Sequence, residues 1–471
     1  MRSTLTATAT IAALIALPIA QGAPAPHPVA LALNQESTSN LNVARAITVP
    51  LKRRRAGARG SADDFLRQAH HMINKYSGTK SEKTKRQADL ELTNYQDAQF
   101  YATVSIGTPS QEFNLIMDTG SSDLILAVEG CRGCQRTTPG LTENESSSLE
   151  ISSTPFQITY GSGQASGTLV RDTVSIANYT VNPQVFAACD TMQNIVDGEI
   201  SGILGLGWQN IAQSEAKPLV QALADDGTLP SPEIAFAFKT YAYDELTNDE
   251  MAGGTMTIGG VDSNLYSGDI NYIDLVQPVG YWQIPLEGIT VEGNSTGITA
   301  DAVVVDTATT LIGGPEAAVA AIYANIPEAQ PYTLQGESGY FSMPCSSQVD
   351  VSLQFGGKSY SIPADSFNAG AIDSAGQNCL GAVFVLPQSS SMPWVIGEAF
   401  LTGVYNTYRF NPPAVGFASL GSGGGSSSIQ DSSSGNTSSG GSGGGTNGAE
   451  KLLNKSTLAL VVLAFSAALA F

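Results

Sequence analysis

One short pattern occurs twice in the 471 residues, and this repeat constrains the fold more than any other feature of the sequence. Each copy is an apolar run followed by Asp, Thr, a small residue, and Ser or Thr. The copies span 115–122 (LIMDTGSS) and 303–310 (VVVDTATT), which puts Asp118 and Asp306 188 residues apart. An internal duplication of this size predicts two similar lobes, each of which brings one carboxylate to a shared interface.

Two aspartates held in contact cannot both ionise easily, so the pair is expected to share one proton. One carboxylate can then deprotonate a bound water while the other protonates a substrate carbonyl. The small residues Gly120 and Ala308 let backbone N–H groups approach the carboxylates, and the hydroxyls of Ser121 and Thr309 can hydrogen-bond the outer oxygens. This chemistry is hydrolytic, and the family resemblance described below implies that it needs no metal and no other cofactor.

From residue 87 to residue 420 the chain consists of short apolar or alternating runs separated by Gly, Pro, Asn and Ser. Such runs predict strands, and the body is therefore expected to be all-β. The clearest predicted strands are 100–106, 113–117, 169–176, 255–258, 302–305 and 351–355. Helices are predicted only at 217–224 and 316–324.

Charge and histidine are unevenly divided along the chain. Residues 1–86 hold 13 of the 22 Lys and Arg but 4 of the 42 Asp and Glu, which leaves the remainder with a net charge of about −29. A body this acidic excludes nucleic acid as a partner. Its excess of Asp and Glu has two possible explanations: the protein works at low pH, where protonated carboxylates repel one another less, or the charge simply keeps it soluble. All three histidines, His27, His70 and His71, lie in the same first segment. If that segment is removed, Ser–His catalysis, Cys–His catalysis and His-ligated zinc are excluded.

The N-terminal segment divides into two parts. Residues 1–22, with Arg2 before an apolar run and small residues at the end, predict a secretory signal peptide. Residues 23–86 predict a propeptide that ends in the dibasic processing pair Lys85-Arg86. A basic propeptide can lie in an acidic cleft and inhibit it, and acidification would weaken that attraction. A disordered basic arm is the alternative.

The C-terminal segment predicts a tether and a lipid-anchor signal. Residues 421–449 are nearly all Gly, Ser, Thr and Asn and form the linker; residues 450–471 are a short polar spacer and an apolar tail of 15 residues. This order is typical of a GPI-attachment signal, with Asn447 as the predicted site and a membrane-spanning tail anchor as the alternative. Glycosylation sequons in the retained chain begin at Asn144, Asn178, Asn294 and Asn436.

The two aspartate segments and several others resemble the pepsin-like aspartic proteases, in the same order and spacing. The matching segments are 118–122, the second copy at 306, the flap sequence Tyr160-Gly161-Ser162-Gly163, and the apolar-Gly segments 203–207 and 394–397. The resemblance covers nearly all of residues 87–420. It implies a bilobal pepsin-like fold, with lobes at 87–265 and 266–420 and a cleft between them for an extended peptide. It also implies a monomer whose catalytic Asp118 and Asp306 are supported by Thr119 and Thr307.

The resemblance also implies how the cysteines pair. Cys345 and Cys379 stand where the family has a disulfide in its second lobe, and Cys131 and Cys134 stand at a small disulfide loop of the first. A Cys-x-x-Cys sequence can also indicate redox chemistry or zinc. The fifth cysteine, Cys189, is expected to be a buried thiol, with an intermolecular bridge as the alternative.

Three departures from the family pattern bear on activity. Ala308 replaces a usual Gly, which is costly only if φ is positive there. Ile125 replaces a Trp that often hydrogen-bonds the flap tyrosine, and Glu398 replaces an Asp. The neutral Ser162 favours substrates with apolar or aromatic residues beside the cut, whereas the anchor signal would suit processing at basic sites.

The sequence therefore predicts a secreted, surface-anchored aspartic endopeptidase that acts on proteins and peptides at acidic pH and is made as a zymogen. Two alternatives stay open. One is a pepsin-fold binding protein whose catalysis is weakened by Ala308. The other is a structural cell-wall protein, which explains the Gly/Ser tether but not the aspartate motifs.

Overall fold

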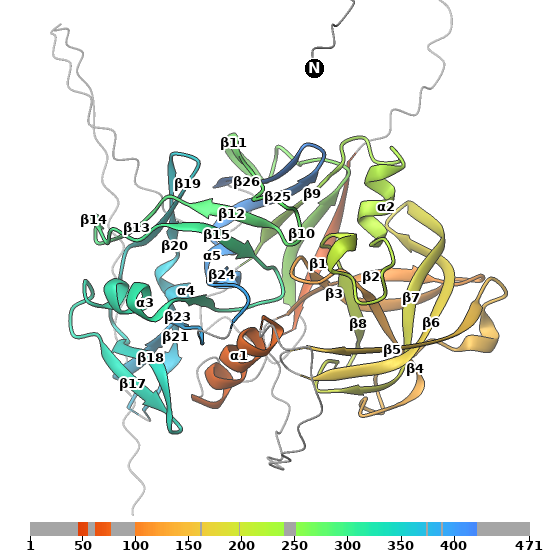
Figure 1. The fold of residues 1–471 in the computed structure, drawn as a ribbon, viewed down its shortest axis with the longest axis horizontal. Coiled ribbons are helices and arrows are strands. Elements are labelled where there is room, and N and C mark those ends of the chain that lie inside the picture. Colours follow the sequence, from red (N-terminus) through yellow and green to blue (C-terminus); the bar gives the residue numbers. More distant parts are fainter. Residues whose placement is uncertain are drawn as a thin grey trace, which may run out of the picture. The chain divides into compact units, whose positions relative to one another are not determined.

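Strands dominate the computed structural model, which confirms the all-β prediction (Figure 1). The structure describes residues 46–54, 62–76, 99–160, 163–196, 198–239, 251–373, 375–387 and 390–421. The predicted signal peptide, Lys85-Arg86, Gly161, Ser162, Asn436, Asn447 and the C-terminal tail lie outside these residues.

Thirteen strands form one large sheet, in the order β11-β26-β25-β9-β10-β1-β2-β3-β8-β4-β7-β6-β5. Strands from both predicted lobes contribute to it, since β11, β25 and β26 come from the second half of the chain. In chain order the strands are β1 (Ile47–Arg54), β2 (Gln99–Ile106), β3 (Gln111–Asp118), β4 (Leu124–Arg132), β5 (Glu150–Thr159), β6 (Gln164–Ile176), β7 (Tyr179–Gln193), β8 (Ile200–Gly205), β9 (Glu233–Phe238), β10 (Met251–Ile258), β11 (Tyr266–Asp274), β25 (Val404–Phe410) and β26 (Pro413–Leu420).

Three smaller sheets come from the second half of the chain, in the orders β12-β15-β24-β16-β23, β14-β13-β19-β20 and β17-β18-β22-β21. Their strands are β12 (Gln283–Leu286), β13 (Gly288–Val291), β14 (Asn294–Ser295), β15 (Ala300–Val305), β16 (Ile312–Gly314), β17 (Gln330–Leu334), β18 (Glu337–Pro344), β19 (Val351–Phe355), β20 (Lys358–Ile362), β21 (Asn368–Ala371), β22 (Asn378–Gly381), β23 (Val383–Val385) and β24 (Val395–Ile396). All six strands predicted from the sequence are present.

Helices are short and few among the described residues. They are α1 (Ala62–Lys75), α2 (Leu219–Asp225), α3 (Glu316–Tyr323), α4 (Ala364–Phe367) and α5 (Glu398–Leu401), with 3-10 turns η1 (Glu143–Glu145) and η2 (Gln209–Ile211). The two helices predicted from the sequence correspond to α2 and α3. None of the helices described is long and apolar enough to cross a membrane.

The predicted propeptide contributes an ordered strand and an ordered helix. Strand β1 lies inside the large sheet, where Lys52 pairs with Ala252 on one side and Tyr101 on the other. Helix α1 buries Phe65, Ala69 and Met72, which recur at helical spacing on one face. In its described parts this segment is therefore integrated into the fold, and the alternative of a disordered arm is wrong there.

The two halves of the chain meet around a fully buried tryptophan. The Trp282 side chain has no exposed surface, and its ring lies 5.0 Å from the rings of both Trp208 and Phe410. Its indole N–H donates to the backbone oxygen of Leu206, 3.0 Å away. Because Leu206 follows directly after β8, this contact fixes the second half of the chain against the segment that supports the first aspartate.

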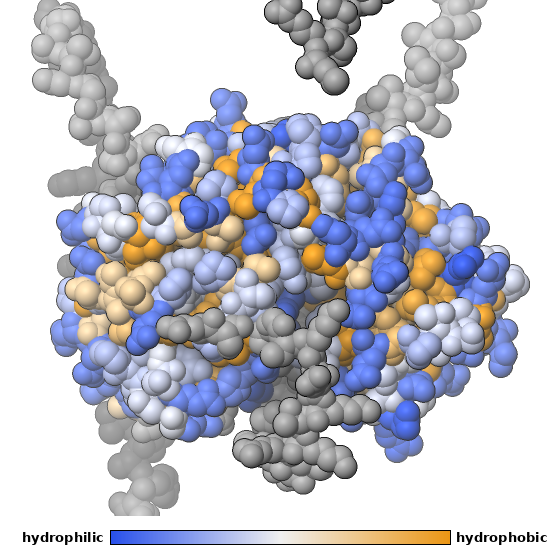
Figure 2. Space-filling model, in the orientation of Figure 1, coloured by the Kyte–Doolittle hydropathy of each residue, from blue (hydrophilic) through white to orange (hydrophobic). Residues whose placement is uncertain are grey.

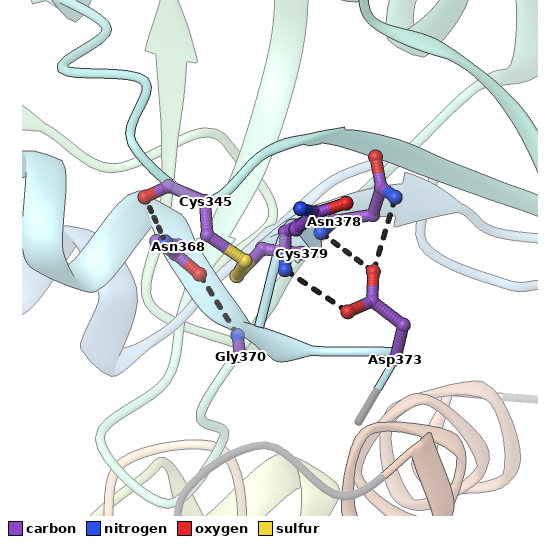
Figure 3. The surroundings of a disulfide bond; sticks show 7 residues. Cys345, Asn368, Gly370, Asp373, Asn378 and Cys379 are labelled. Carbon is purple, nitrogen blue, oxygen red and sulfur yellow. Dashed lines mark hydrogen bonds between the residues drawn. A yellow bond between two sulfur atoms is a disulfide. The ribbon is translucent and has the colours of Figure 1, made fainter. Parts of the chain in front are cut away.

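Both predicted disulfides are present. Cys345–Cys379 joins β22 to the end of β18, and Asn368 donates to the backbone oxygen of Cys345 beside it (Figure 3). Cys131–Cys134 closes a small loop at the end of β4. Cys189 is a buried free thiol, as predicted.

Hydrophilic side chains cover most of the face in Figure 2, with smaller hydrophobic areas between them. Among the described residues, Ile151 is the large hydrophobic side chain that stands out as exposed, at 58%. The sequons at Asn144, Asn178 and Asn294 all lie at exposed positions.

Candidate active site

Each aspartate sits where a buried strand ends beside a second, parallel strand. In the first half, β3 pairs with β8, so that Asp118 lies opposite Gly205. In the second half, β15 pairs with β24, and the Asp306 N–H donates to the backbone oxygen of Ile396 at 3.0 Å. The crossing segments must contain glycine, because a Cβ on Gly205 would lie 2.3 Å from the backbone of Ser122. The apolar-Gly segments found in the sequence thus position the two aspartate loops in the same way.

The two aspartate loops are joined by reciprocal hydrogen bonds between their threonines. The Thr119 N–H donates to Thr307 Oγ1 at 3.1 Å, and the Thr307 N–H donates to Thr119 Oγ1 at 3.0 Å. Each hydroxyl also donates across the interface, Thr119 to the Val305 oxygen at 3.0 Å and Thr307 to the Met117 oxygen at 2.7 Å. All donors and acceptors here are buried, so the network holds the loops in one relative position.

Each carboxylate receives the same two hydrogen bonds from its own loop. Backbone N–H groups donate to the Oδ1 atoms: Gly120 to Asp118 at 2.8 Å, and Ala308 to Asp306 at 3.0 Å. Hydroxyls donate to the Oδ2 atoms, Ser121 to Asp118 and Thr309 to Asp306. The two halves of the site therefore have equivalent hydrogen bonding.

The small residues of the two loops are not equivalent, however. A Cβ on Gly120 would lie 2.5 Å from the carboxyl carbon of Asp306, so no side chain fits there. Ala308 has a methyl group that packs against the cluster containing Ile125 and Tyr160, and its φ is not in the left-handed region. The structure thus accommodates Ala308 without the backbone cost considered from the sequence.

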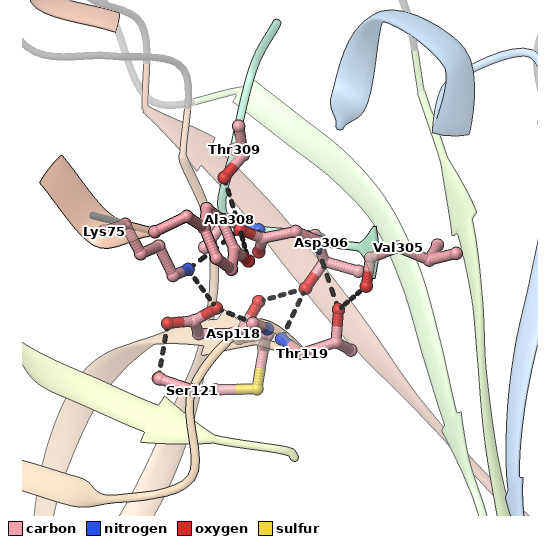
Figure 4. A network of polar contacts seen from close by, with 12 residues as sticks. Lys75, Asp118, Thr119, Ser121, Val305, Asp306, Ala308 and Thr309 are labelled. Atoms are coloured by element: carbon pink, nitrogen blue, oxygen red, sulfur yellow. Dashed lines mark hydrogen bonds and ion pairs between the residues drawn. The ribbon is translucent and has the colours of Figure 1, made fainter. Parts of the chain in front are cut away.

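Helix α1 ends at the aspartate pair. Lys75 Nζ, whose side chain is only 5% exposed, lies 2.8 Å from Asp118 Oδ1 and 2.9 Å from Asp306 Oδ2 (Figure 4). The Tyr76 hydroxyl donates to the same Asp306 oxygen at 2.8 Å. One ammonium nitrogen within reach of both carboxylates places them close enough to share a single small ligand.

Tyr76 is itself held from the second half of the chain. Its backbone oxygen accepts the Ser391 N–H at 2.8 Å and hydroxyl bonds from Ser390 and Ser391. Its ring packs edge-on against Tyr281, with centroids 5.7 Å apart. Tyr76 is therefore bound through both its backbone and its side chain, and Lys75 through its side chain.

The charges explain opposite pKa shifts in the two aspartates. Burial raises the pKa of Asp118, and this effect outweighs the Lys75 ammonium. Burial also acts to raise the pKa of Asp306, but Lys75, Thr309 and the Ala308 N–H together hold it well below its usual range. Burial alone would lower the pKa of Lys75, yet the two carboxylates raise it. The ammonium is thus charged and is paired with at least one ionised carboxylate.

The flap tyrosine is described, whereas Gly161 and Ser162 are not. Tyr160 follows β5, and its N–H donates to the Gly163 oxygen at 2.7 Å, so β5 and β6 form a hairpin at this point. Its ring is buried among apolar residues that include Ile125, and its hydroxyl has no hydrogen-bond partner among the described residues. Burial raises the pKa of this hydroxyl well above its ordinary value.

Lys75 and Tyr76 were not singled out from the sequence. The apolar spacing of Phe65, Ala69, Met72 and Tyr76 could have predicted helix α1, but nothing local in the sequence points that helix at the aspartates. The other notable residue here is Glu398, which lies at the start of α5 with its side chain buried.

Comparisons with known proteins agree with this geometry. The sequence profile of the family "Eukaryotic aspartyl protease" matches residues 99–420. The chain is 42% identical over 341 residues to major aspartyl peptidase 1 of Cryptococcus neoformans var. grubii, covering 69% of this chain and 70% of that protein. It is 34% identical to an aspartic protease of Phaffia rhodozyma (71% and 80% covered) and 30% identical to pepsin A of Sus scrofa (79% and 95% covered).

Proposed function

Since this chain belongs to the pepsin-like family of aspartic proteases and is an aspartic endopeptidase, we propose that Asp118 and Asp306 are its catalytic pair. The observation that carries this assignment is the single Lys75 nitrogen within 2.9 Å of both carboxylates. The Thr119–Thr307 hydrogen bonds join the two loops, 188 residues apart, at the point where both aspartates reach this atom.

The proposed reaction uses a water molecule in the position that Lys75 takes here. With one proton shared by the pair, an ionised carboxylate removes a proton from the water, and the resulting oxygen attacks the carbonyl carbon of the substrate. The protonated carboxyl donates to the carbonyl oxygen, which gives a tetrahedral diol. Proton transfer to the amide nitrogen then lets the C–N bond break and restores the pair. Ser121, Thr309 and the backbone N–H groups hold the carboxylates in place throughout.

The propeptide is proposed to keep this site closed until activation. Lys75 neutralises charge on the pair and Tyr76 occupies the adjoining position, so no substrate carbonyl can approach the carboxylates. The protein would thus be a zymogen that is activated when the segment ending at Lys85-Arg86 is released. The aromatic contact of Tyr76 with Tyr281 supports a preference for substrates with aromatic or apolar residues beside the cut.

Catalytic activity fits the structure better than a pure binding role. The feature that favoured weakened catalysis was Ala308, and this residue donates its N–H to Asp306 just as Gly120 donates to Asp118.

A direct test compares protein digestion after acidification of the zymogen, with and without pepstatin, for the wild type and Asp118→Asn. We expect digestion by the wild type alone, and we expect pepstatin to abolish it. Digestion that resists pepstatin and survives Asp118→Asn would refute the assignment.

We further propose that the protein is a secreted monomer, glycosylated at Asn144, Asn178, Asn294 and Asn436, and held at the cell surface by a GPI anchor at Asn447. The exposure of the first three asparagines supports this glycosylation. Treatment of intact cells with phosphatidylinositol-specific phospholipase C should release the protease into the medium. Retention after that treatment, together with resistance to wall-degrading enzymes, would contradict the anchor.

A further inference from the structure

Two adjacent histidines on α1 have opposite environments. His70 is part exposed, and its Nε2 lies 2.7 Å from Glu337 Oε2 on β18. Both ring nitrogens of His71 are buried, and neither has a hydrogen-bond partner among the described residues. A neutral imidazole tolerates this site at a moderate cost, whereas an imidazolium would carry two buried N–H donors without acceptors.

The charged groups around His71 make its protonation still less favourable. Lys75 lies one helical turn later on the same side of α1, and its ammonium disfavours a second positive charge on His71. The opposing negative charge that acts on His71 comes from Asp306, which follows β15. That carboxylate already binds Lys75 and Tyr76. Burial first, and Lys75 second, lower the pKa of His71 from 6.5 to about 4.

The aspartate pair itself responds poorly to mild acid while α1 is docked. Asp306 has a pKa well below its usual range, so it stays ionised and retains Lys75. Asp118, whose pKa is raised by burial, can take up a proton without releasing Lys75 from Asp306. Carboxylate protonation at the pair therefore does not account for release of α1 in mildly acidic conditions.

We propose that His71 is the acid sensor of the propeptide: its protonation, in a site with no free acceptor and with Lys75 one turn away, drives α1 from the aspartate pair. This inference rests on the proposed zymogen function and names the residue that regulates it. The residue that responds to acid then lies on the inhibitory helix itself. It responds at a higher pH than the range in which Asp306 loses its charge.

The sign and size of the effect follow from linkage. The docked helix holds His71 neutral, and the released helix lets it titrate at its ordinary pKa of 6.5. The contribution of His71 to docking is therefore constant above pH 6.5, falls as the pH is lowered from 6.5 to 4, and is constant again below 4, where other groups titrate. The difference between the two pKa values of His71, 6.5 when released and about 4 when docked, corresponds to a decrease of about 300-fold in the docking equilibrium.

The test measures opening of the uncleaved zymogen between pH 7 and pH 3. A fluorescent pepstatin derivative is mixed with the wild type, His71→Gln or His70→Gln, and binding is followed in the first seconds, before cleavage. Hydrogen exchange of the α1 backbone in the same buffers gives a second readout. The His70→Gln zymogen is the matched control, because it makes the same substitution on the same helix at the exposed neighbour.

We expect the wild type and His70→Gln to open between pH 6.5 and 4, and His71→Gln to stay closed over that range and open only in stronger acid. Coincident profiles for the wild type and His71→Gln would overturn the proposal. Protease activity after removal of the propeptide is measured separately, because the released enzyme lacks residue 71. If the wild type shows no protease activity after propeptide removal, the proposed function is refuted. Protease activity in the His71→Gln preparation shows that this variant folds.

Discussion

Replacement of Lys75 by methionine tests the proposal that helix α1 acts as a propeptide and holds the site closed. Methionine keeps the apolar stem of the side chain and removes the ammonium that bridges Asp118 and Asp306 at 2.8 and 2.9 Å. Because the Lys75 side chain is 5% exposed and the carboxylates are 2% and 0% exposed, little solvent screens these ion pairs.

The expected loss is large because one partner of a buried charge cluster is removed. Such losses cost about 3–5 kcal/mol. The two aspartates can share a proton once Lys75 is gone, which relieves part of that cost. We therefore expect a loss at the lower end of this range, which weakens the docking equilibrium roughly 100-fold. The Lys75 ammonium is charged throughout the accessible range, since its pKa is raised, and the loss should therefore persist at pH 6.

The assay is binding of the same fluorescent pepstatin derivative to uncleaved zymogen at pH 6. Lys75→Met should bind it far more readily than the wild type does. Lys217→Met is the matched control, because Lys217 pairs with Asp225 at 2.8 Å but is 40% exposed; exposed pairs of this kind contribute about 0–1 kcal/mol. If Lys75→Met and Lys217→Met were equally closed, the buried bridge would not be what inhibits the site.

Three further changes test other parts of the structure. Gly120→Ala should lower kcat by at least about 100-fold, because its methyl would collide with Asp306, while Ala308→Gly should leave kcat within about threefold; equal effects would contradict the asymmetry of the two loops. Thr119→Val leaves the Thr307 N–H without its acceptor and should cost about 1–3 kcal/mol of unfolding free energy, measured by denaturant titration and compared with the exposed Thr180→Val. Removing Cys345–Cys379 should cost about 3–4 kcal/mol, because it opens a loop of 34 residues, and removing Cys131–Cys134 should cost much less; calorimetry that ranks them in the opposite order would refute the loop argument.

The convergence of Asp118 and Asp306 could be predicted because it follows from a repeated local pattern. Each copy encodes its own strand and turn, and the apolar-Gly segments encode the strands that cross beneath them. Duplication then leaves few ways to arrange the two carboxylates other than facing each other. The described disulfides were likewise predictable, since the family resemblance supplied their pairing.

The contacts of strand β1 and helix α1 could not be predicted in the same way. Strand β1 pairs with residues about 200 positions later in the chain, and neither its apolar content nor its length specifies those partners. The position of Lys75 depends on how α1 packs on the second half of the chain, a tertiary property that no local motif encodes. For the Tyr160 hydroxyl, by contrast, Ile125 leaves two possibilities, another partner or a looser flap, and the sequence does not choose between them.

The most direct test of the central proposal is a double-mutant cycle of Asp118→Asn and Asp306→Asn, measured as kcat/KM on a fluorogenic peptide after removal of the propeptide. If the two carboxylates act as one proton-sharing unit, each single variant should lose at least about 10⁴-fold and the double variant should lose no more than either. Losses that multiply in the double variant, or a single variant that keeps a tenth of the wild-type rate, would contradict a shared proton between the two halves.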